Sequence, residues 1–142
     1  MRDLTKYRLE AAVERLAVSK NLAEDGHYKI SVTNSYYAIF NAVRALLSER
    51  YVDFKKHSAV ISYFRREYIK TGLLDVKFSS YIGDAFRARQ YSDYDDFVIV
   101  SREQAETQYQ HAVEFVEAVK IYLEDENVCD DKGDKLLPAR AD

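Results

Sequence analysis

Helix-breaking residues are almost absent from this 142-residue chain, and that absence constrains its fold more than any other feature. The sequence contains four glycines and one proline, and Pro138 lies among the last five residues. Glycine and proline are the residues that most strongly interrupt helices. The alternation of apolar and polar residues between turn residues that marks β-strands is also missing. The sequence therefore predicts an all-α fold.

Apolar residues recur at helical spacing along most of the chain. Residues 28–50 are apolar around most of the helix circumference, which predicts a helix buried on more than one side at the centre of the fold. A glycine in "EDGH" (24–27) ends the helix before it, and Ser101 with Gln104 forms a capping box that starts the last helix. The predicted helices span residues 3–25, 28–50, 57–70, 76–90 and 101 onwards.

Short turns between these segments indicate an up-and-down helical bundle of four long helices and one short helix. We expect the bundle to occupy residues 1–125 and an acidic flexible tail to occupy residues 126–142, where the pattern turns irregular after Glu124. The β-like run "FVIV" (97–100) is short and isolated, and we interpret it as a buried connection into the last helix.

Composition excludes several classes of protein. Cys129 is the only cysteine, so neither an intramolecular disulfide nor a cysteine-rich zinc site is available. No stretch approaches the roughly 20 apolar residues that span a bilayer, and no signal-peptide run follows Met1. We therefore expect a cytoplasmic protein with no membrane contact. Residues 44–90 hold ten Lys or Arg against five Asp or Glu, which is compatible with a polyanionic partner.

The stretch "RARQYSDYDDF" (87–97) concentrates charge and tyrosine between two helices. Its aspartates lack the glycine and the distal glutamate of a calcium loop, and the chain has no pair of Glu-x-x-His motifs for a di-iron bundle. There is also no glycine-rich phosphate loop and no G-x-S-x-G elbow. We therefore expect no metal and no cofactor.

His57 is the most informative of the three histidines. It follows two lysines and starts a helix, where backbone N–H groups favour anions, although it could also simply cap and pack. Tyrosine is unusually frequent, with 12 residues and no tryptophan. Tyr36, Tyr37 and Phe40 fall on the apolar second helix, where tyrosine can serve packing, an interface or base stacking.

Three segments, taken in order, resemble the HEPN domain proteins, in particular their small stand-alone subgroup. They are "TNSYYAIFNAVRALLSER" (33–50), "KKHSAVISYFRREYIKTGLLD" (55–75) and "AFRARQYSDYDDF" (85–97). The resemblance covers about residues 5–123. It implies a helical bundle that forms a homodimer and pairs with a minimal nucleotidyltransferase in a toxin–antitoxin-like two-gene module. It also implies metal-independent ribonuclease chemistry, in which an Arg and a His lie in a cleft between subunits.

This chain departs from the family motif at the histidine. The motif arginine corresponds to Arg89, or less well to Arg87, and the histidine position is occupied by Tyr94. A tyrosine of ordinary pKa near 10 is a poor base at neutral pH. We hypothesise that His57 lies beside Arg89 and Tyr94 and replaces the missing base. The alternative is that Arg89 pairs with Asp93 or Asp95 and only shapes the turn.

The resemblance thus implies a dimeric, toxin-like protein that binds RNA or a nucleotide in a cleft. Whether it is an enzyme depends on the His57 hypothesis. The alternatives are a non-catalytic module that binds a nucleotidyltransferase or nucleotide, and a structural homodimer. Tyr94 or Tyr91 could also accept a nucleotidyl group from the partner. The expected catalytic residues are Arg89, Tyr94 and His57, and the expected binding residues are Arg87, Tyr91, Asp93, Asp95 and Tyr37.

Overall fold

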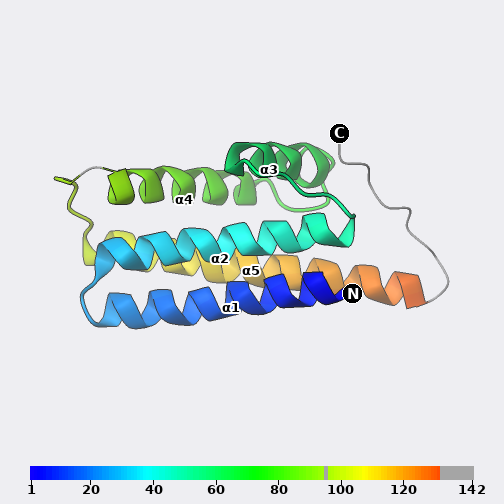
Figure 1. Ribbon diagram of the computed structural model, residues 1–142, viewed down its shortest axis with the longest axis horizontal. Helices are drawn as coiled ribbons and strands as arrows, with labels where there is room; N and C mark the ends of the chain where they lie inside the picture. Colours follow the sequence, from blue (N-terminus) through cyan, green and yellow to red (C-terminus); the bar gives the residue numbers. More distant parts are fainter. Residues whose placement is uncertain (95, 132–142) are drawn as a thin grey trace.

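The computed structural model describes residues 1–94 and 96–131, and it confirms the all-α prediction for them. Figure 1 shows a bundle in which α2 lies between α1 and α4, with α5 behind. The helices are α1 (Asp3–Glu24), α2 (Tyr28–Glu49), α3 (His57–Phe64), its π-helical continuation η1 (Arg65–Ile69), α4 (Lys77–Tyr94) and α5 (Arg102–Asp131). Among the described residues, none of these helices is both long enough and apolar enough to cross a membrane.

The second helix is the centre of the bundle, as its apolar circumference predicted. It contacts α1, α3, α4 and α5. Ala38, Ala42 and Ala45 are wholly buried, and their small side chains allow neighbouring helices to approach closely. Burial of α2 on several sides fixes the orientation of its remaining half-exposed ridge, which includes Tyr37 and Arg44.

A cluster of buried serines joins α1 to α2. Ser19 Oγ lies 3.0 Å from Ser31 Oγ and 2.6 Å from Ser35 Oγ. Ser19 also donates to the Ser31 carbonyl at 2.9 Å, and Ser31 donates to the Ser19 carbonyl at 2.8 Å. All three side chains are fully buried, and buried hydroxyls are stable only when they are hydrogen-bonded. The cluster therefore satisfies its own polar groups inside an otherwise apolar contact.

The first two helices end in left-handed residues. Gly26 has φ +85°, and the next residue, His27, donates its N–H to the Leu22 carbonyl at 2.8 Å. This confirms the glycine stop predicted from "EDGH". After α2, Tyr51 adopts φ 62°, a conformation uncommon outside glycine, and its ring lies 3.8 Å from the Arg2 guanidinium.

Two boundaries differ from the prediction. Helix α4 continues to Tyr94 instead of ending near residue 90, and Asp93 in its last turn pairs with Arg89 and accepts a hydrogen bond from Thr33 of α2. Helix α5 continues to Asp131, past the predicted start of the tail at residue 126. Residues 132–142 of that tail lie outside the described residues.

The prediction that residues 97–100 form a buried connection is wrong. Phe97 is 92% exposed and Ile99 is 90% exposed, whereas Val98 and Val100 are half-buried. The segment therefore presents alternate side chains to solvent, because no described helix covers its outer side.

The predicted capping box at the start of α5 is confirmed and allows a stability test. Gln104 N donates to Ser101 Oγ at 3.0 Å, and Ser101 N donates to Gln104 Oε1 at 2.9 Å. Ser101→Ala is expected to lower the free energy of unfolding by about 1 kcal/mol, measured by urea denaturation. Ser62→Ala, at an exposed position inside α3, is the control and should change it by less than about 0.5 kcal/mol.

Candidate functional site

Aromatic side chains of α2 form the base of the candidate site. Tyr36 is wholly buried, and its ring centroid lies 5.2 Å from that of Tyr37 and 5.7 Å from that of Phe40. Phe86 of α4 contacts the Tyr36 ring edge-on at 5.9 Å. Tyr36 and Phe40 are one helical turn apart and share a face, so the helix presents a continuous aromatic surface towards α3 and α4.

His57, the first residue of α3, lies on this aromatic surface. Its ring stacks on Phe40 with centroids 4.0 Å apart, and its Nδ1 is hydrogen-bonded to the Tyr36 hydroxyl at 2.8 Å. These contacts fix the orientation of the imidazole. In the tautomer in which Nδ1 carries the proton and donates it to the Tyr36 hydroxyl oxygen, Nε2 is the unprotonated ring nitrogen available to a substrate.

The surroundings of His57 favour its neutral form. Burial lowers the pKa of His57 below its ordinary value, and the positive charges of Arg89 and Arg44 lower the pKa further. Burial also raises the pKa of Tyr36, so that its hydroxyl stays protonated. A histidine with a lowered pKa is neutral at physiological pH and can accept a proton.

Arg89 reaches the same aromatic surface from α4. Its Nη2 donates to the Tyr37 hydroxyl at 3.0 Å, and its guanidinium lies 5.6 Å from the Tyr36 ring centroid and 5.5 Å from that of Tyr37. Its Nε donates to Asp93 at 2.9 Å, and the other Asp93 oxygen accepts from Thr33 at 2.8 Å. The side chain is only 15% exposed, so these contacts hold it in one position.

Of the two sequence-based hypotheses about Arg89, the ion pair with Asp93 is observed, whereas direct reach between His57 and Arg89 stays a prediction. The Arg89–Asp93 ion pair forms, and His57 and Arg89 also belong to one cluster because Tyr36 contacts both. The side chain of Tyr94 and all of Asp95 lie outside the described residues, so the parts of the hypotheses that involve them stay predictions.

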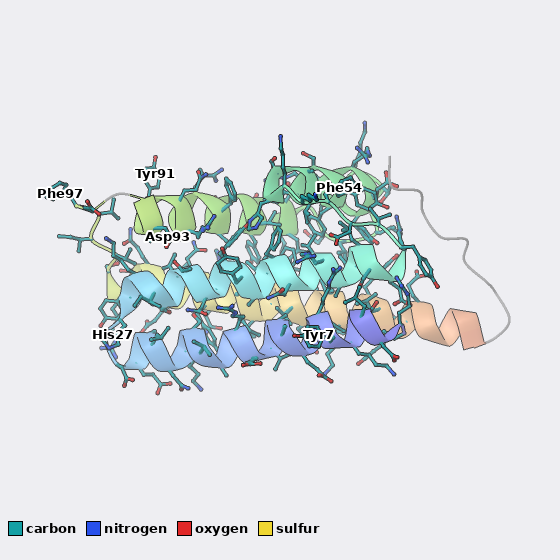
Figure 2. The ribbon with its side chains drawn as sticks, in the orientation of Figure 1. Tyr7, His27, Phe54, Tyr91, Asp93 and Phe97 are labelled. Atoms are coloured by element: carbon teal, nitrogen blue, oxygen red, sulfur yellow. The ribbon has the colours of Figure 1, made fainter. Side chains whose placement is uncertain are left out.

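Two of the expected binding residues lie elsewhere. Arg87 forms an ion pair with Asp84, and Tyr91 is 61% exposed. Figure 2 shows Asp93 on the side of α4 that faces α2 and Tyr91 on the outer side. Residues two apart on a helix differ by about 200° in direction, which explains why Arg87 and Arg89 diverge. The cluster that the fold assembles is therefore His57, Arg89, Asp93 and Tyr37, with Tyr36 beneath.

The sequence did not single out further cations beside the cluster. The Arg15 guanidinium of α1 lies 5.4 Å from the Tyr37 ring centroid and donates to Asn34 at 2.9 Å. Arg44 of α2 lies seven residues after Tyr37, about two helical turns along the same half-exposed face of the helix. The seven-residue spacing from Tyr37 to Arg44 could have identified Arg44 from the sequence. Arg15 could not be identified in this way, because its position depends on how α1 packs against α2.

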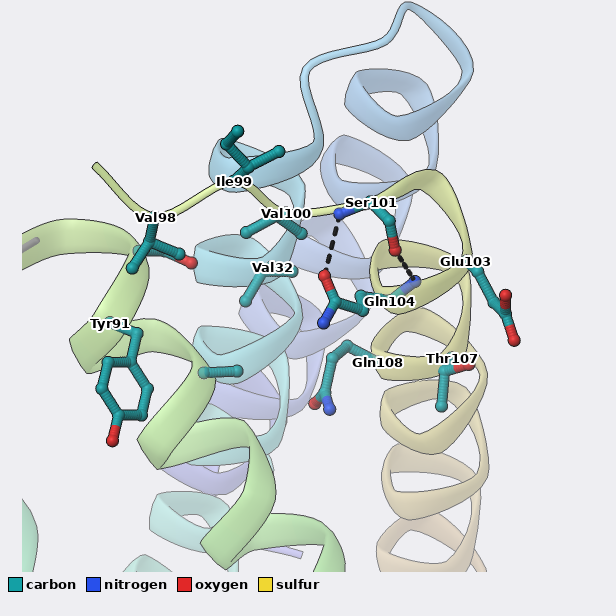
Figure 3. Close-up of a pocket in the computed structure, with 12 residues that line it drawn as sticks. Val32, Tyr91, Val98, Ile99, Val100, Ser101, Glu103, Gln104, Thr107 and Gln108 are labelled. Atoms are coloured by element: carbon teal, nitrogen blue, oxygen red, sulfur yellow. Dashed lines mark hydrogen bonds between the residues drawn. The ribbon is translucent and has the colours of Figure 1, made fainter. Parts of the chain in front are cut away.

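Two pockets adjoin these residues. One, of about 460 Å³, lies beside His57 and is lined by Phe40, Arg44, Asp53, Phe54, Lys55 and His57. The other, of about 650 Å³, lies between the end of α4 and the start of α5, where Tyr91, Val98 and Ser101 contribute to its wall (Figure 3). The lining of the larger pocket includes neither histidine nor arginine. The smaller pocket is lined by His57 and Arg44, so it is the one that adjoins the cluster.

No group of three or more His, Cys, Asp or Glu side chains that could hold a metal ion occurs within residues 1–94 and 96–131. The described chemistry of the cluster is instead that of a neutral histidine beside a fixed guanidinium on an aromatic surface. Such a pair can accept a proton and stabilise negative charge within one site.

Comparison with known proteins gives a consistent result. The chain is 36% identical over 133 residues to a Methanocaldococcus jannaschii protein named "Putative toxin MJ0142", covering 94% of this chain and 90% of that protein. It is 30% identical to a "UPF0332 protein" of Thermotoga maritima, covering 86% of this chain and 92% of the other. A second Methanocaldococcus jannaschii protein, "Putative toxin MJ0605", is also 30% identical, with 88% and 92% covered.

The family comparison covers nearly all of the bundle. Residues 5–122 match the family described as the HEPN domain, a span that includes most of α1, all of α2 to α4 and most of α5. The span also agrees with the extent of the resemblance seen in the sequence. The chain therefore belongs to the HEPN domain family.

Proposed function

We propose that this chain is a toxin-like HEPN protein that acts on RNA through the cluster of His57, Arg89 and the α2 tyrosines. The observation that carries the proposal is the hydrogen bond between His57 Nδ1 and Tyr36, which leaves Nε2 for chemistry beside the Arg89 guanidinium. The names of two relatives, which describe toxins, and the basic residues around the site support an RNA-directed role.

The proposed reaction is cleavage of the RNA backbone by its own 2′-hydroxyl. Neutral His57, with its proton on Nδ1 and donated to Tyr36, takes the proton of the 2′-hydroxyl on Nε2, and the 2′-oxygen forms a bond to the adjacent phosphorus. The bond from phosphorus to the 5′-oxygen breaks, and that oxygen takes a proton from solvent. Arg89 stabilises the negative charge that develops on the phosphate oxygens. The products are a 2′,3′-cyclic phosphate and a 5′-hydroxyl end.

The assembly belongs to the same proposal. We infer a homodimer in which two clusters share a cleft, and a minimal nucleotidyltransferase encoded beside this chain that controls it. The support is the sequence resemblance to stand-alone HEPN proteins and the relatives with toxin names. In this scheme Tyr91, which is largely exposed, and Tyr94 are the candidates to accept a nucleotidyl group.

One contact favours a second function, a non-catalytic module that binds RNA, nucleotide or the nucleotidyltransferase. Asp93 neutralises much of the Arg89 charge through an ion pair of 2.9 Å. A paired arginine stabilises a developing charge less than an unpaired one does, but it still hydrogen-bonds a ligand. Under this alternative the cluster binds but does not cleave.

The test is incubation of the purified protein with labelled tRNA in EDTA. Wild-type protein is expected to cleave, and Arg89→Ala to cleave at least about 100-fold more slowly, because one charge-stabilising donor is worth about that much. Arg87→Ala is the matched control on the opposite side of α4 and should cleave within about threefold of wild type. Binding without cleavage by wild-type protein would support the non-catalytic module, and equal loss in both variants would contradict the assigned site.

A further inference from the structure

The pocket beside His57 has the size and position of a binding subsite. Its volume is about 460 Å³, within the range of small-molecule sites and sufficient for one nucleotide. Phe40 and Arg44 reach it from α2, whereas Asp53, Phe54 and Lys55 belong to the connection that leads into α3. His57 forms part of its wall, so the pocket is continuous with the proposed reaction centre.

Flat aromatic surfaces line this pocket. The His57 and Phe40 rings are stacked at 4.0 Å with an angle of 23° between their planes. Phe54 is half-buried and lines the pocket, and its ring centroid lies 5.7 Å from that of Tyr63. Part of the Phe54 side chain is therefore accessible from the pocket. Accessible aromatic rings stack on unpaired nucleobases.

The polar lining of the pocket carries excess positive charge. Asp53 is shared by two arginines, at 3.1 Å from Arg44 and 3.3 Å from Arg8. Lys55 adds a third cation at the pocket rim. The Arg44 side chain is 33% exposed, and Lys55 lines the same pocket, so both cations are accessible to a phosphate oxygen.

We infer that this pocket is a base-selecting subsite for the nucleotide next to the scissile phosphate of RNA. The base stacks on Phe54, and the phosphate of that nucleotide lies towards Arg44 and Lys55. Phe54 is then a specificity-determining residue. The inference rests on the proposed function, since His57 borders both the pocket and the reaction centre. The same chemistry would also hold a free nucleoside monophosphate, so the test separates the two sources.

Binding is measured by calorimetry, without any cleavage step. The probes are AMP, GMP, CMP, UMP, ribose 5-phosphate, and a 2′-O-methyl RNA hexamer that cannot be cleaved. Wild-type protein is expected to bind the hexamer and to bind at least one nucleotide more tightly than ribose 5-phosphate. Phe54→Leu is expected to weaken hexamer binding by about 5- to 150-fold through loss of stacking. Tighter binding of a nucleotide than of the hexamer would assign the pocket to free nucleotide and overturn the RNA subsite.

The matched control is Phe97→Leu, which changes a 92% exposed phenylalanine at the opposite end of the bundle (Figure 2) and should bind like wild type. If Phe54→Leu does not fold, Arg44→Gln tests the phosphate side of the pocket, with Asp53 still paired to Arg8. Equal hexamer affinity of wild type and the folded pocket variant overturns the inference. RNA binding and RNA cleavage are measured in separate experiments. Absence of cleavage would contradict the proposed function, whereas only the hexamer-binding measurement decides whether the pocket binds RNA.

Discussion

The His57→Gln variant is expected to lose RNA cleavage by about 10²- to 10⁴-fold, the usual contribution of a positioned general base. Glutamine keeps a polar group near the Tyr36 hydroxyl, which is 2.8 Å from His57 Nδ1, but it cannot accept and release a proton at neutral pH. The measurement is the initial rate of cleavage of labelled tRNA in EDTA, with the fold of the variant checked by circular dichroism.

His111→Gln is the control for this substitution. His111 stacks on Tyr81 with centroids 3.9 Å apart, at the contact between α4 and α5, and it takes no part in the His57 cluster. Its variant should cleave within about threefold of wild type. If His57→Gln also keeps that rate, the histidine is a packing residue and the proposed mechanism is wrong.

The wild-type rate should also depend on pH in a defined direction. Burial and the charges of Arg89 and Arg44 lower the pKa of His57, so its neutral form becomes fully populated at a lower pH than for an ordinary histidine. A general base acts in its neutral form. The rate should therefore rise with pH through this lowered pKa and level off above it, and residual cleavage by His57→Gln should not show that rise.

The largest effect on stability is expected for Phe64→Ala, which should lower the free energy of unfolding by about 3–5 kcal/mol. Phe64 is wholly buried at the end of α3, with its ring centroid 5.4 Å from that of Phe115 and 6.0 Å from that of Tyr68. Its removal leaves a cavity between α3 and α5. Urea denaturation measures the loss, which is a large part of the 5–15 kcal/mol typical of a whole domain.

Phe97→Ala is the matched control, since it removes the same ring from a position that is 92% exposed. It should change the free energy of unfolding by less than about 0.5 kcal/mol. A loss below about 1 kcal/mol for Phe64→Ala would show that α3 is not held by this contact. His57 and Phe64 are the first and last residues of the same helix, α3.

Local signals allowed most of the fold to be predicted from the sequence. The capping box of Ser101 and Gln104 and the glycine stop at Gly26 act within one helical turn, so they are readable without tertiary information. The end of α4 was not readable in this way, since Asp93 accepts a hydrogen bond from Thr33, which lies 60 residues earlier. The exposure of Phe97 was missed because an apolar run does not reveal whether another element covers it.

The candidate site was only partly predictable for the same reason. His57 and Arg89 were chosen from the sequence, and the fold brings both to α2. The role of Tyr36 was left open between packing, an interface and base stacking, and His57 could not be identified as its partner because their contact depends on how the connection before α3 folds back. Arg87 was grouped with Arg89 by proximity in sequence, whereas the helical turn separates them.

The buried serines between α1 and α2 have a consequence for the alignment of these two helices. A purely apolar contact tolerates sliding, but the hydrogen bonds among Ser19, Ser31 and Ser35 form in only one register. Displacement by one helical turn, about 5.4 Å, would leave these hydroxyls buried without partners. The hydrogen bonds therefore fix the axial register of α1 against α2. This register places the Arg15 guanidinium beside the Tyr37 ring whether or not a ligand is bound.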